Sequence, residues 1–350
     1  MPLKLDIKDR KILYYLSRDG RLSDTQLSKM VALSKNGVAY RIERLKEEGV
    51  IERFSAIVNL QAVGYTTVAM ILKFNQDIYK VPELTAYLRD HPFVAWASVI
   101  SGQWDIFCEF VVKDVTGLYR MVQGLVQHYG ERLADYEVYF SFDVIRVEHL
   151  VQDFYQDLDV EEILPKPPAE KPYHLDETDG KLLHALCKDS SLSYLDLSKR
   201  LGLSLVVTRY RIKKLQEHGV IVKFYPEIDL KKLGYTEYLY KIRLRNASSE
   251  RMRSLFFSIS KNPSIIYAFF DVVSAHLFLI CAYKTIEGID ELSRALRNAY
   301  GSFIATQEFY PFKEHLPFIL FPKGLVGARK DSGKREGSPP FSRSYVISVM

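Results

Sequence analysis

The hydrophobic and polar residues of this chain follow one pattern twice. Segments 5–65 and 175–235 align without a gap, and 26 of the 61 aligned positions hold the same residue. A repeat of this length indicates a duplicated structural unit. Within each copy, apolar residues recur at helical spacing over three short segments, and a strand-like segment follows. The pattern predicts three helices and then a strand, in both copies.

Polar residues mark where the helices of the first copy begin. Asp6, Ser23 and Ser34 each stand directly before a helical pattern, where a short polar side chain can accept a hydrogen bond from a free backbone N–H. Gly49 follows the third helix and is suited to end it. Residues 50–57 then have strand character. Three short helices with a tight second turn and a following strand predict a winged helix-turn-helix.

The segment after each winged module repeats a second order of elements: strand, helix, strand, strand, helix, strand. This is the ferredoxin-like βαββαβ pattern. The predicted strands are 67–75, 93–100, 105–112 and 136–147, with helices at 81–90 and 116–129. In the second copy the elements are 238–245, 250–261, 265–273, 276–283, 286–300 and 303–312. The predicted fold class is therefore α+β.

These patterns divide the chain into six parts. They are a winged helix-turn-helix at 1–60, a ferredoxin-like domain at 61–150, an acidic Pro-rich linker at 151–174, a second winged helix-turn-helix at 175–234, a second ferredoxin-like domain at 235–322, and a basic tail at 323–350 that is expected to be disordered.

Composition narrows the functional class. The 350 residues are 47% hydrophobic and 26% charged, as in ordinary globular proteins. There is no apolar run of ~18 residues and no signal-peptide core, so we expect a cytoplasmic protein without a membrane span. The three cysteines are far apart and form no CxxC pair, which argues against a metal site or a disulfide framework.

The charge distribution favours nucleic acid as a partner. Residues 1–60 contain 12 Lys or Arg and 8 Asp or Glu, and residues 175–234 contain 11 and 8. Residues 61–150 have the opposite balance, with 7 and 11. Basic modules attract the phosphate backbone, and acidic ones do not. Both winged modules are therefore candidates for binding double-stranded DNA.

The third helix of the first copy is the predicted recognition helix. Val38, Ile42 and Leu45 fall on one face and are expected to be buried. Residues at the start of such a helix reach base edges, and later basic residues hold phosphates. For Arg41 and Arg44, the alternative to a phosphate contact is ion pairing with Glu47 and Glu48 at the surface. The candidate DNA-binding residues are Ser34, Lys35, Asn36, Tyr40, Arg41 and Arg44.

The second copy keeps the scaffold and changes this face. Leu205, Val206 and Val207 replace Lys35, Asn36 and Gly37. Apolar side chains can touch thymine methyl groups but carry little hydrogen-bond code. The module either holds phosphates weakly or buries this apolar face against another domain. Its candidate DNA-binding residues are Arg209, Arg211, Lys213 and Lys214.

Residues 5–65 and the βαββαβ order after them resemble the Lrp/AsnC family, the feast/famine transcription regulators, and so do residues 175–322. In that family the second domain binds effectors and dimerises. Ser101–Asp105 resembles the family's G-x-x-D turn, so the resemblance implies an amino-acid effector beside Gly102, Trp104 and Asp105. The alternative is a plain hairpin turn. The motif is lost in the second copy, at Val273 and His276.

The sequence therefore predicts a sequence-specific DNA-binding transcription regulator without a cofactor. The halves could form an internal pseudo-dimer, or each could pair with a second chain in a homo-oligomer. One alternative is an enzyme like the siroheme decarboxylases, which resemble pairs of Lrp-like halves. The expected histidine cluster is missing, because the histidines are scattered, and we expect no catalytic residues and no enzyme. The other alternative is an architectural DNA-binding protein.

Overall fold

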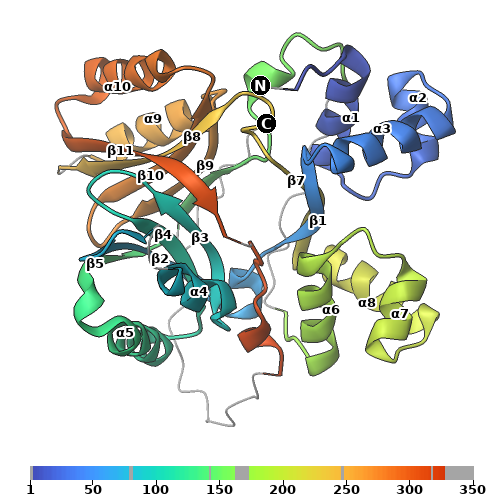
Figure 1. The fold of residues 1–350 in the computed structure, drawn as a ribbon, viewed down its shortest axis with the longest axis horizontal. Coiled ribbons are helices and arrows are strands. Elements are labelled where there is room, and N and C mark those ends of the chain that lie inside the picture. The colour runs from blue at the N-terminus through green and yellow to red at the C-terminus, as the bar shows by residue number, and fades with distance from the viewer. Residues whose placement is uncertain are drawn as a thin grey trace.

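The structure is a computed structural model that describes residues 3–78, 82–141, 143–161, 173–245, 248–316 and 318–327. Two parts stand side by side in Figure 1: a set of strands with helices on their outer faces, and two three-helix modules. The proline-containing part of the predicted linker and the tail beyond residue 327 lie outside the described residues.

Both winged modules have the predicted elements. The helix starts are set by side-chain caps: Asp6 and Asp176 accept from the backbone N–H of Asp9 and Asp179 at 2.8 and 2.7 Å. The elements of the first module are α1 (Ile7–Arg18), α2 (Asp24–Val31), α3 (Lys35–Glu47) and β1 (Ile51–Val58). Those of the second are α6 (Glu177–Lys188), α7 (Tyr194–Leu201), α8 (Leu205–Glu217) and β7 (Ile221–Ile228).

The strand of each winged module pairs with its counterpart in the same chain. β1 and β7 form an antiparallel pair in which Ser55 lies opposite Tyr225 and Phe54 lies opposite Pro226. Ser55 and Tyr225 are equivalent positions of the repeat, 170 residues apart. An antiparallel pair centred on equivalent positions relates the two modules by an approximate two-fold axis, as in an isologous dimer. The two halves thus form a pseudo-dimer within one chain.

The ferredoxin-like domains merge into one nine-stranded antiparallel sheet, with the order β5-β2-β4-β3-β11-β8-β10-β9-β6. The strands are β2 (Thr66–Phe74), β3 (Val94–Ile100), β4 (Ile106–Val112), β5 (Leu133–Phe140), β6 (Asp143–Val147), β8 (Thr236–Leu244), β9 (Ile265–Asp271), β10 (His276–Tyr283) and β11 (Ile304–His315). The helices are α4 (Glu83–Asp90), α5 (Val115–Tyr129), α9 (Ser249–Ser260) and α10 (Ile286–Tyr300).

The halves exchange strands. The segment 136–147, expected to be one strand, is divided into β5, which pairs with β2 of its own half, and β6, which pairs with β9 of the other half. β11 does the same in one continuous strand: Ile304–Pro311 pairs with β8, and Phe312–His315 pairs with β3. Each half therefore supplies a strand to the sheet of the other.

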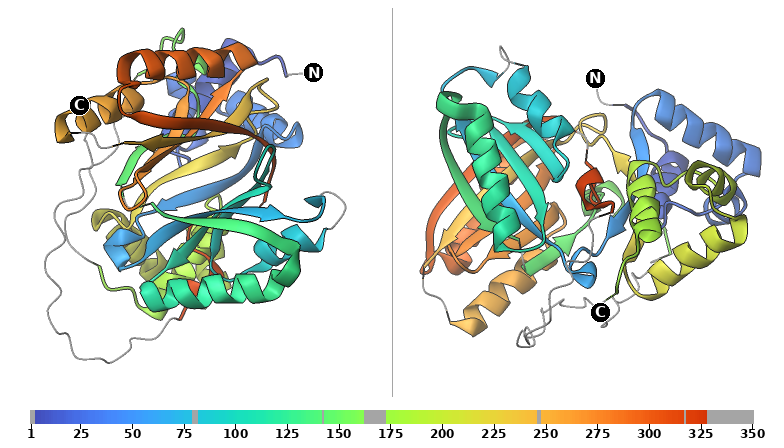
Figure 2. Two further views of the ribbon diagram at one scale, coloured as in Figure 1. Left: turned by 90° about the vertical axis from the view of Figure 1, so that its left-hand side faces the viewer. Right: turned by 90° about the horizontal axis from the view of Figure 1, so that it is seen from below.

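The inner faces of the two half-sheets meet in an aromatic core. The ring of Phe278 lies 4.6 Å from that of Tyr139 and 6.3 Å from that of Phe107, between ring centroids. The helices cover the outer faces, with α10 and α5 on opposite sides of the strands in Figure 2. Three free cysteines, Cys108, Cys187 and Cys281, are buried within the described residues. No helix in the described ranges is long and apolar enough to cross a membrane.

Two segments differ from the expected linker and tail. Residues before 162 lie against α1, where the Arg10 guanidinium binds the Phe154 carbonyl at 2.9 Å and the Asp157 carboxylate at 3.0 Å. The 3-10 turn η5 (Lys323–Leu325) is ordered, because Leu325 is buried against the second winged module and Gly324 donates a backbone hydrogen bond to Pro92 at 2.7 Å. Buried apolar side chains at both places outweigh the polar composition around them.

Candidate nucleic-acid interface

The first turn of α3 presents its side chains to solvent. Ser34 caps the helix by accepting from the Gly37 N–H at 3.0 Å, while Val38 and Leu45 are fully buried. Lys35, Asn36 and Tyr40 are exposed, and they make no hydrogen bond or ion pair with the described residues. Their polar groups are therefore available to an external partner.

Arg41 and Arg44, predicted to contact phosphates, form ion pairs with carboxylates of α1. Arg41 Nη1 lies 2.7 Å from both Asp6 Oδ2 and Asp9 Oδ1, and Arg44 Nη2 lies 2.6 Å from Asp9 Oδ2. Asp9 is only 1% exposed. The predicted pairing with the glutamates is limited to Arg44 and Glu48 at 3.8 Å. The two arginines fasten α3 to α1, a contact that local spacing could not reveal.

The same tie recurs in the second module. Arg211 Nη1 lies 2.6 Å from Asp176 Oδ2 and 2.7 Å from Asp179 Oδ1, and these hydrogen bonds raise the pKa of the guanidinium. Arg211, like Arg41, therefore joins two helices of its module, and its predicted phosphate contact stays a prediction. Because both copies retain it, the tie belongs to the scaffold of the module.

Three other predicted cations of α8 remain at the surface. Arg209 is exposed, with its guanidinium 5.5 Å from the ring centroid of Tyr194. Lys213 is exposed and lies 3.5 Å from Glu217, one helical turn on. Lys214 is half-buried, with its ammonium over the ring of Tyr173. Exposed pairs of this kind are weak, so Arg209 and Lys213 can exchange them for phosphate.

The apolar turn of α8 is not buried against another domain. Val206 is 76% exposed and Val207 39%, while Leu205 is half-buried. Tyr210, the counterpart of Tyr40, is exposed as well. Of the two outcomes left open by the sequence, burial against a domain of the same chain is excluded within the described residues.

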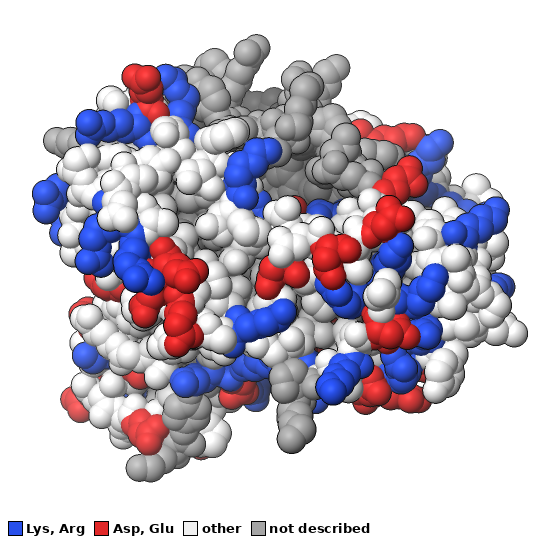
Figure 3. Space-filling model, turned by 90° about the horizontal axis from the view of Figure 1, so that it is seen from above, with Lys and Arg blue, Asp and Glu red and all other residues white. Residues whose placement is uncertain are grey.

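Charge does not mark the interface on the face that Figure 3 displays. Lys and Arg are interspersed there with Asp and Glu, without a large region of one sign. The assignment of an interface to α3 and α8 therefore rests on their place in the fold and on their exposed side chains.

The predicted effector residues contact other parts of the protein. Gly102 has φ +138°, and a Cβ there would lie 2.9 Å from Cδ1 of Tyr310 in the other half. Trp104 is buried. The Asp105 carboxylate accepts from the Phe74 N–H at 2.7 Å, and burial raises its pKa. The turn thus serves as a junction between halves, and effector binding beside these residues stays a prediction.

Buried ionisable groups lie between the two half-sheets. Lys241 Nζ lies 2.5 Å from Glu137 Oε2, which also accepts from the Tyr139 hydroxyl. Burial raises the pKa of Glu109 to about 7, although a hydrogen bond from the Tyr267 hydroxyl at 3.4 Å acts in the opposite direction. Glu109 is enclosed by the aromatic core, whereas the Glu137 side chain is 41% exposed, so the Lys241–Glu137 pair has a solvent-facing side where a carboxylate could bind.

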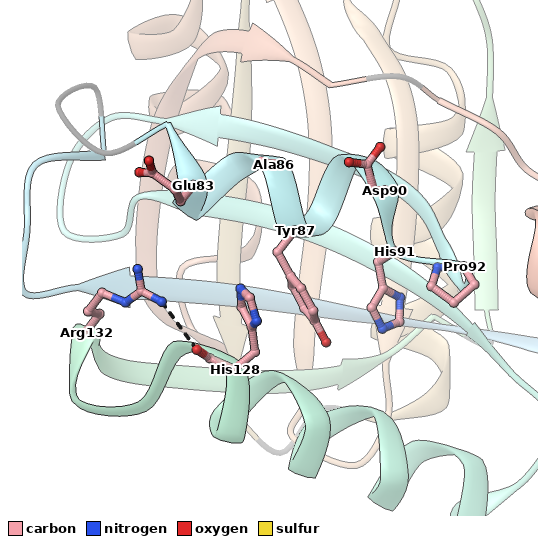
Figure 4. Close-up of a pocket in the computed structure, with 8 residues that line it drawn as sticks. All are labelled: Glu83, Ala86, Tyr87, Asp90, His91, Pro92, His128 and Arg132. Atoms are coloured by element: carbon pink, nitrogen blue, oxygen red, sulfur yellow. Dashed lines mark hydrogen bonds between the residues drawn. The ribbon is translucent and has the colours of Figure 1, made fainter.

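A pocket of about 500 Å³ opens on the outer face of the first ferredoxin-like domain, between α4 and α5 (Figure 4). The His128 ring stacks on Tyr87 at 3.8 Å, and His91 lies on the other side of Tyr87. Burial, and secondarily His128, lowers the pKa of His91 to about 4. In the sequence, the two histidines are far apart and suggest no common site. The four-residue spacing of Tyr87 and His91 places both on one helical face and could have predicted their contact.

A second pocket, of about 600 Å³, lies on the same domain and is lined by Tyr119, Val122, Gln123, Val126, Gln127 and Tyr136. Neither of these two pockets includes a residue predicted from the sequence to bind DNA or an effector.

The fold and the exposed third helices define a protein with two winged helix-turn-helix modules. A family model described as "Winged helix-turn-helix DNA-binding" matches residues 5–52 and 175–222. An HTH-type transcriptional regulator of Pyrococcus horikoshii is 35% identical over 120 residues, 34% of this chain and 75% of the relative. The leucine-responsive regulatory protein of Rhizobium meliloti is 31% identical over 115 residues, which are 32% of this chain and 74% of the relative. The chain belongs to the Lrp/AsnC family of HTH-type transcription regulators.

A solved structure that covers nearly the whole chain is an enzyme. The siroheme decarboxylase NirDL matches with a TM-score of 0.61 at 15% identity, over 91% of this chain and 96% of that one. The structure of the same enzyme in complex with an iron-uroporphyrin III analogue matches with a TM-score of 0.59 at 14% sequence identity. This likeness shows a shared fold. It contradicts our expectation that the chain is not an enzyme, because an enzyme has this architecture over its full length.

Proposed function

We propose that this regulator binds double-stranded DNA with both winged modules of a single chain, in the cytoplasm, and controls transcription from specific sites. The supporting observation is the β1–β7 pair centred on Ser55 and Tyr225, which relates α3 and α8 by an approximate two-fold axis. Two-fold related recognition helices suit two half-sites about 34–36 Å apart, one turn of the double helix.

Genome-wide footprinting followed by titration of the strongest site tests this proposal. We expect discrete sites and an affinity that is roughly 10³-fold or more above that for random DNA at the same salt concentration. Equal affinity for both kinds of DNA would instead indicate an architectural DNA-binding protein.

We further propose that an amino acid or a related small molecule modulates DNA binding, as the family resemblance implies. At the predicted turn, the amino group of a ligand would compete with the Phe74 N–H for the Asp105 carboxylate. Calorimetry of the full chain against the twenty amino acids tests the effector. If one binds, Asp105→Asn should weaken it; binding that this substitution leaves unchanged would place the effector elsewhere.

A second candidate function is the modification of a tetrapyrrole carboxylate. The likeness to siroheme decarboxylase over 91% of the chain favours it. Lys241, Tyr139 and His276, between the halves, are the groups best suited to a carboxylate substrate. We expect a shifted Soret band on mixing with iron-uroporphyrin, lost in Lys241→Met, and loss of carbon dioxide by mass spectrometry. An unshifted spectrum together with an unchanged substrate mass would exclude this function.

A further inference from the structure

The two recognition helices are held alike. Ser34 and Ser204 cap α3 and α8 by accepting from the N–H three residues on, at 3.0 and 3.2 Å. Each helix is tied back to the first helix of its module, by Arg41 in one copy and Arg211 in the other. The helices have the same length, 13 residues, so equivalent positions present their side chains in equivalent directions.

The exposed side chains at those equivalent positions are chemically different. On α3 they are Lys35, Asn36, Ala39, Tyr40 and Glu43, and on α8 they are Val206, Arg209, Tyr210 and Lys213, with half-buried Leu205 at the position of Lys35. The first set can donate hydrogen bonds to base edges. The second set begins with an apolar turn, and its polar groups are cations further along the helix.

DNA is the occupant that best fits the apolar turn of α8. Leu205 and Val206 occupy the same positions as Lys35 and Asn36 across the approximate two-fold axis, at the end of the helix that reaches base edges. Exposed Arg209 follows within one turn and can hold a phosphate. In the major groove the apolar group available to such side chains is the 5-methyl of thymine.

We propose that the chain recognises a non-palindromic operator. One half-site is read by hydrogen bonds from Lys35 and Asn36, and the other is thymine-rich and is read by Leu205 and Val206 through methyl contacts. This inference rests on the proposed DNA-binding function. It goes further by assigning a different sequence class to each half of the operator.

Selection of sites from a random double-stranded library with the full chain is the first test. We expect two half-sites of different sequence at one-turn spacing, one of them rich in thymine. Replacing thymine by deoxyuridine in that half-site removes only the methyl groups and should weaken binding 3- to 30-fold. The same replacement in the other half-site should change it less than 2-fold.

A grafted variant provides the matched experiment. Leu205→Lys with Val206→Asn gives α8 the first two residues of α3, and should shift selection toward a palindrome of the first half-site. Leu205→Ala with Val206→Ala, at unchanged thermal stability, should remove the deoxyuridine effect while leaving the first half-site in place.

The outcomes separate the inference from the function beneath it. A palindromic operator for the unmodified chain, or equal deoxyuridine effects in both half-sites, overturns the inference and leaves DNA binding intact. Absence of any selected site overturns the proposed function itself. Selection of the first half-site alone, unchanged by the double alanine variant, shows that α8 does not read DNA and also overturns the inference.

Discussion

The two winged modules of this chain are alike where side chains face inward and different where they face outward. Asp9 with Arg41 and Asp179 with Arg211 form the same tie between the first and third helices. Lys35 and Asn36 have Leu205 and Val206 as counterparts at the surface. A buried carboxylate needs its partner, whereas an exposed first turn is free to change. Residues shared by the copies therefore belong to the scaffold, and the residues that differ lie on the surface proposed to read DNA.

Removing a scaffold carboxylate should have the largest effect. Asp9→Ala deletes the partner of Arg41 and Arg44 and the cap contact to Asp6, so we expect a loss of about 3 kcal/mol in the free energy of unfolding. Asp179→Ala should cost somewhat less, because it removes one guanidinium contact and a hydrogen bond from the neutral Tyr173 hydroxyl in place of two guanidinium contacts. Thermal unfolding followed by circular dichroism measures both. An exposed change, Lys35→Ala, is the control, and equal stability of all three would refute the structural role of the tie.

The two half-sheets differ at the buried acid Glu109. Glu109 on β4 corresponds to Ile280 on β10. Because burial raises the pKa of Glu109 to about 7, its protonated form is favoured in the folded chain, so stability falls as pH rises from the ordinary glutamate value near 4.5 towards 7. Glu109→Gln should remove this dependence, a difference of about 3 kcal/mol at pH 8.

Urea unfolding at pH 5 and pH 8 measures the Glu109 effect. The prediction fails if the variant and the original chain change in parallel between the two pH values. His91→Gln provides a contrast of opposite sign. The folded pKa of His91 is lowered to about 4 from an ordinary value near 6.5, so His91 makes stability rise between pH 5 and about 6.5, and the substitution should remove that rise.

The turns before β4 and β10 offer a sharper test of the junction between halves. Gly102→Ala adds a Cβ beside Tyr310 at a positive φ, so we expect a loss of about 1–2 kcal/mol. Its counterpart Val273 is exposed, so Val273→Ala should be close to neutral. Differential scanning calorimetry compares the two. A neutral Gly102→Ala would mean that the turn is free to move, as an effector site would require.

The smallest expected effects distinguish the cations of α8. Arg209→Ala should reduce the slope of log affinity against log salt by about one while leaving stability unchanged. Arg211→Ala should lower the melting temperature and keep the slope, because its guanidinium is held by Asp176 and Asp179. Fluorescence anisotropy over a salt series measures the slope. If Arg211→Ala reduced the salt slope and left the melting temperature unchanged, Arg211 would be a phosphate contact.

Local signals predicted the elements well. The helix Ile286–Tyr300 has the expected bounds, because its apolar residues repeat with strong helical period and its length leaves little ambiguity. Ser34 and Asp6 mark helix starts because the capping hydrogen bond is made three residues away. The α+β fold with two winged modules and ferredoxin-like domains followed from these signals and is confirmed.

Contacts between distant segments were not predictable from the sequence. Arg41 binds carboxylates 32 and 35 residues away, while its near neighbours Glu47 and Glu48 offered a plausible local pairing. The division of 136–147 into two strands carries no periodic signal, because both pieces remain extended and only their partners change. Tyr310, from the other half, lies over Gly102, and this contact cannot be predicted from the motif Ser101–Asp105 alone.

The exchange of β6 and β11 within one chain has a consequence for dilution. When two separate chains form a paired unit, the paired fraction depends on their concentration and falls as copy number falls. Here the partner is tethered, and a tether keeps it at an effective concentration that dilution of the protein does not lower. Even at a low copy number, each molecule would therefore still carry both winged modules as a pair. Curves of DNA binding against protein concentration should lack the steepening that dimerisation coupled to binding produces.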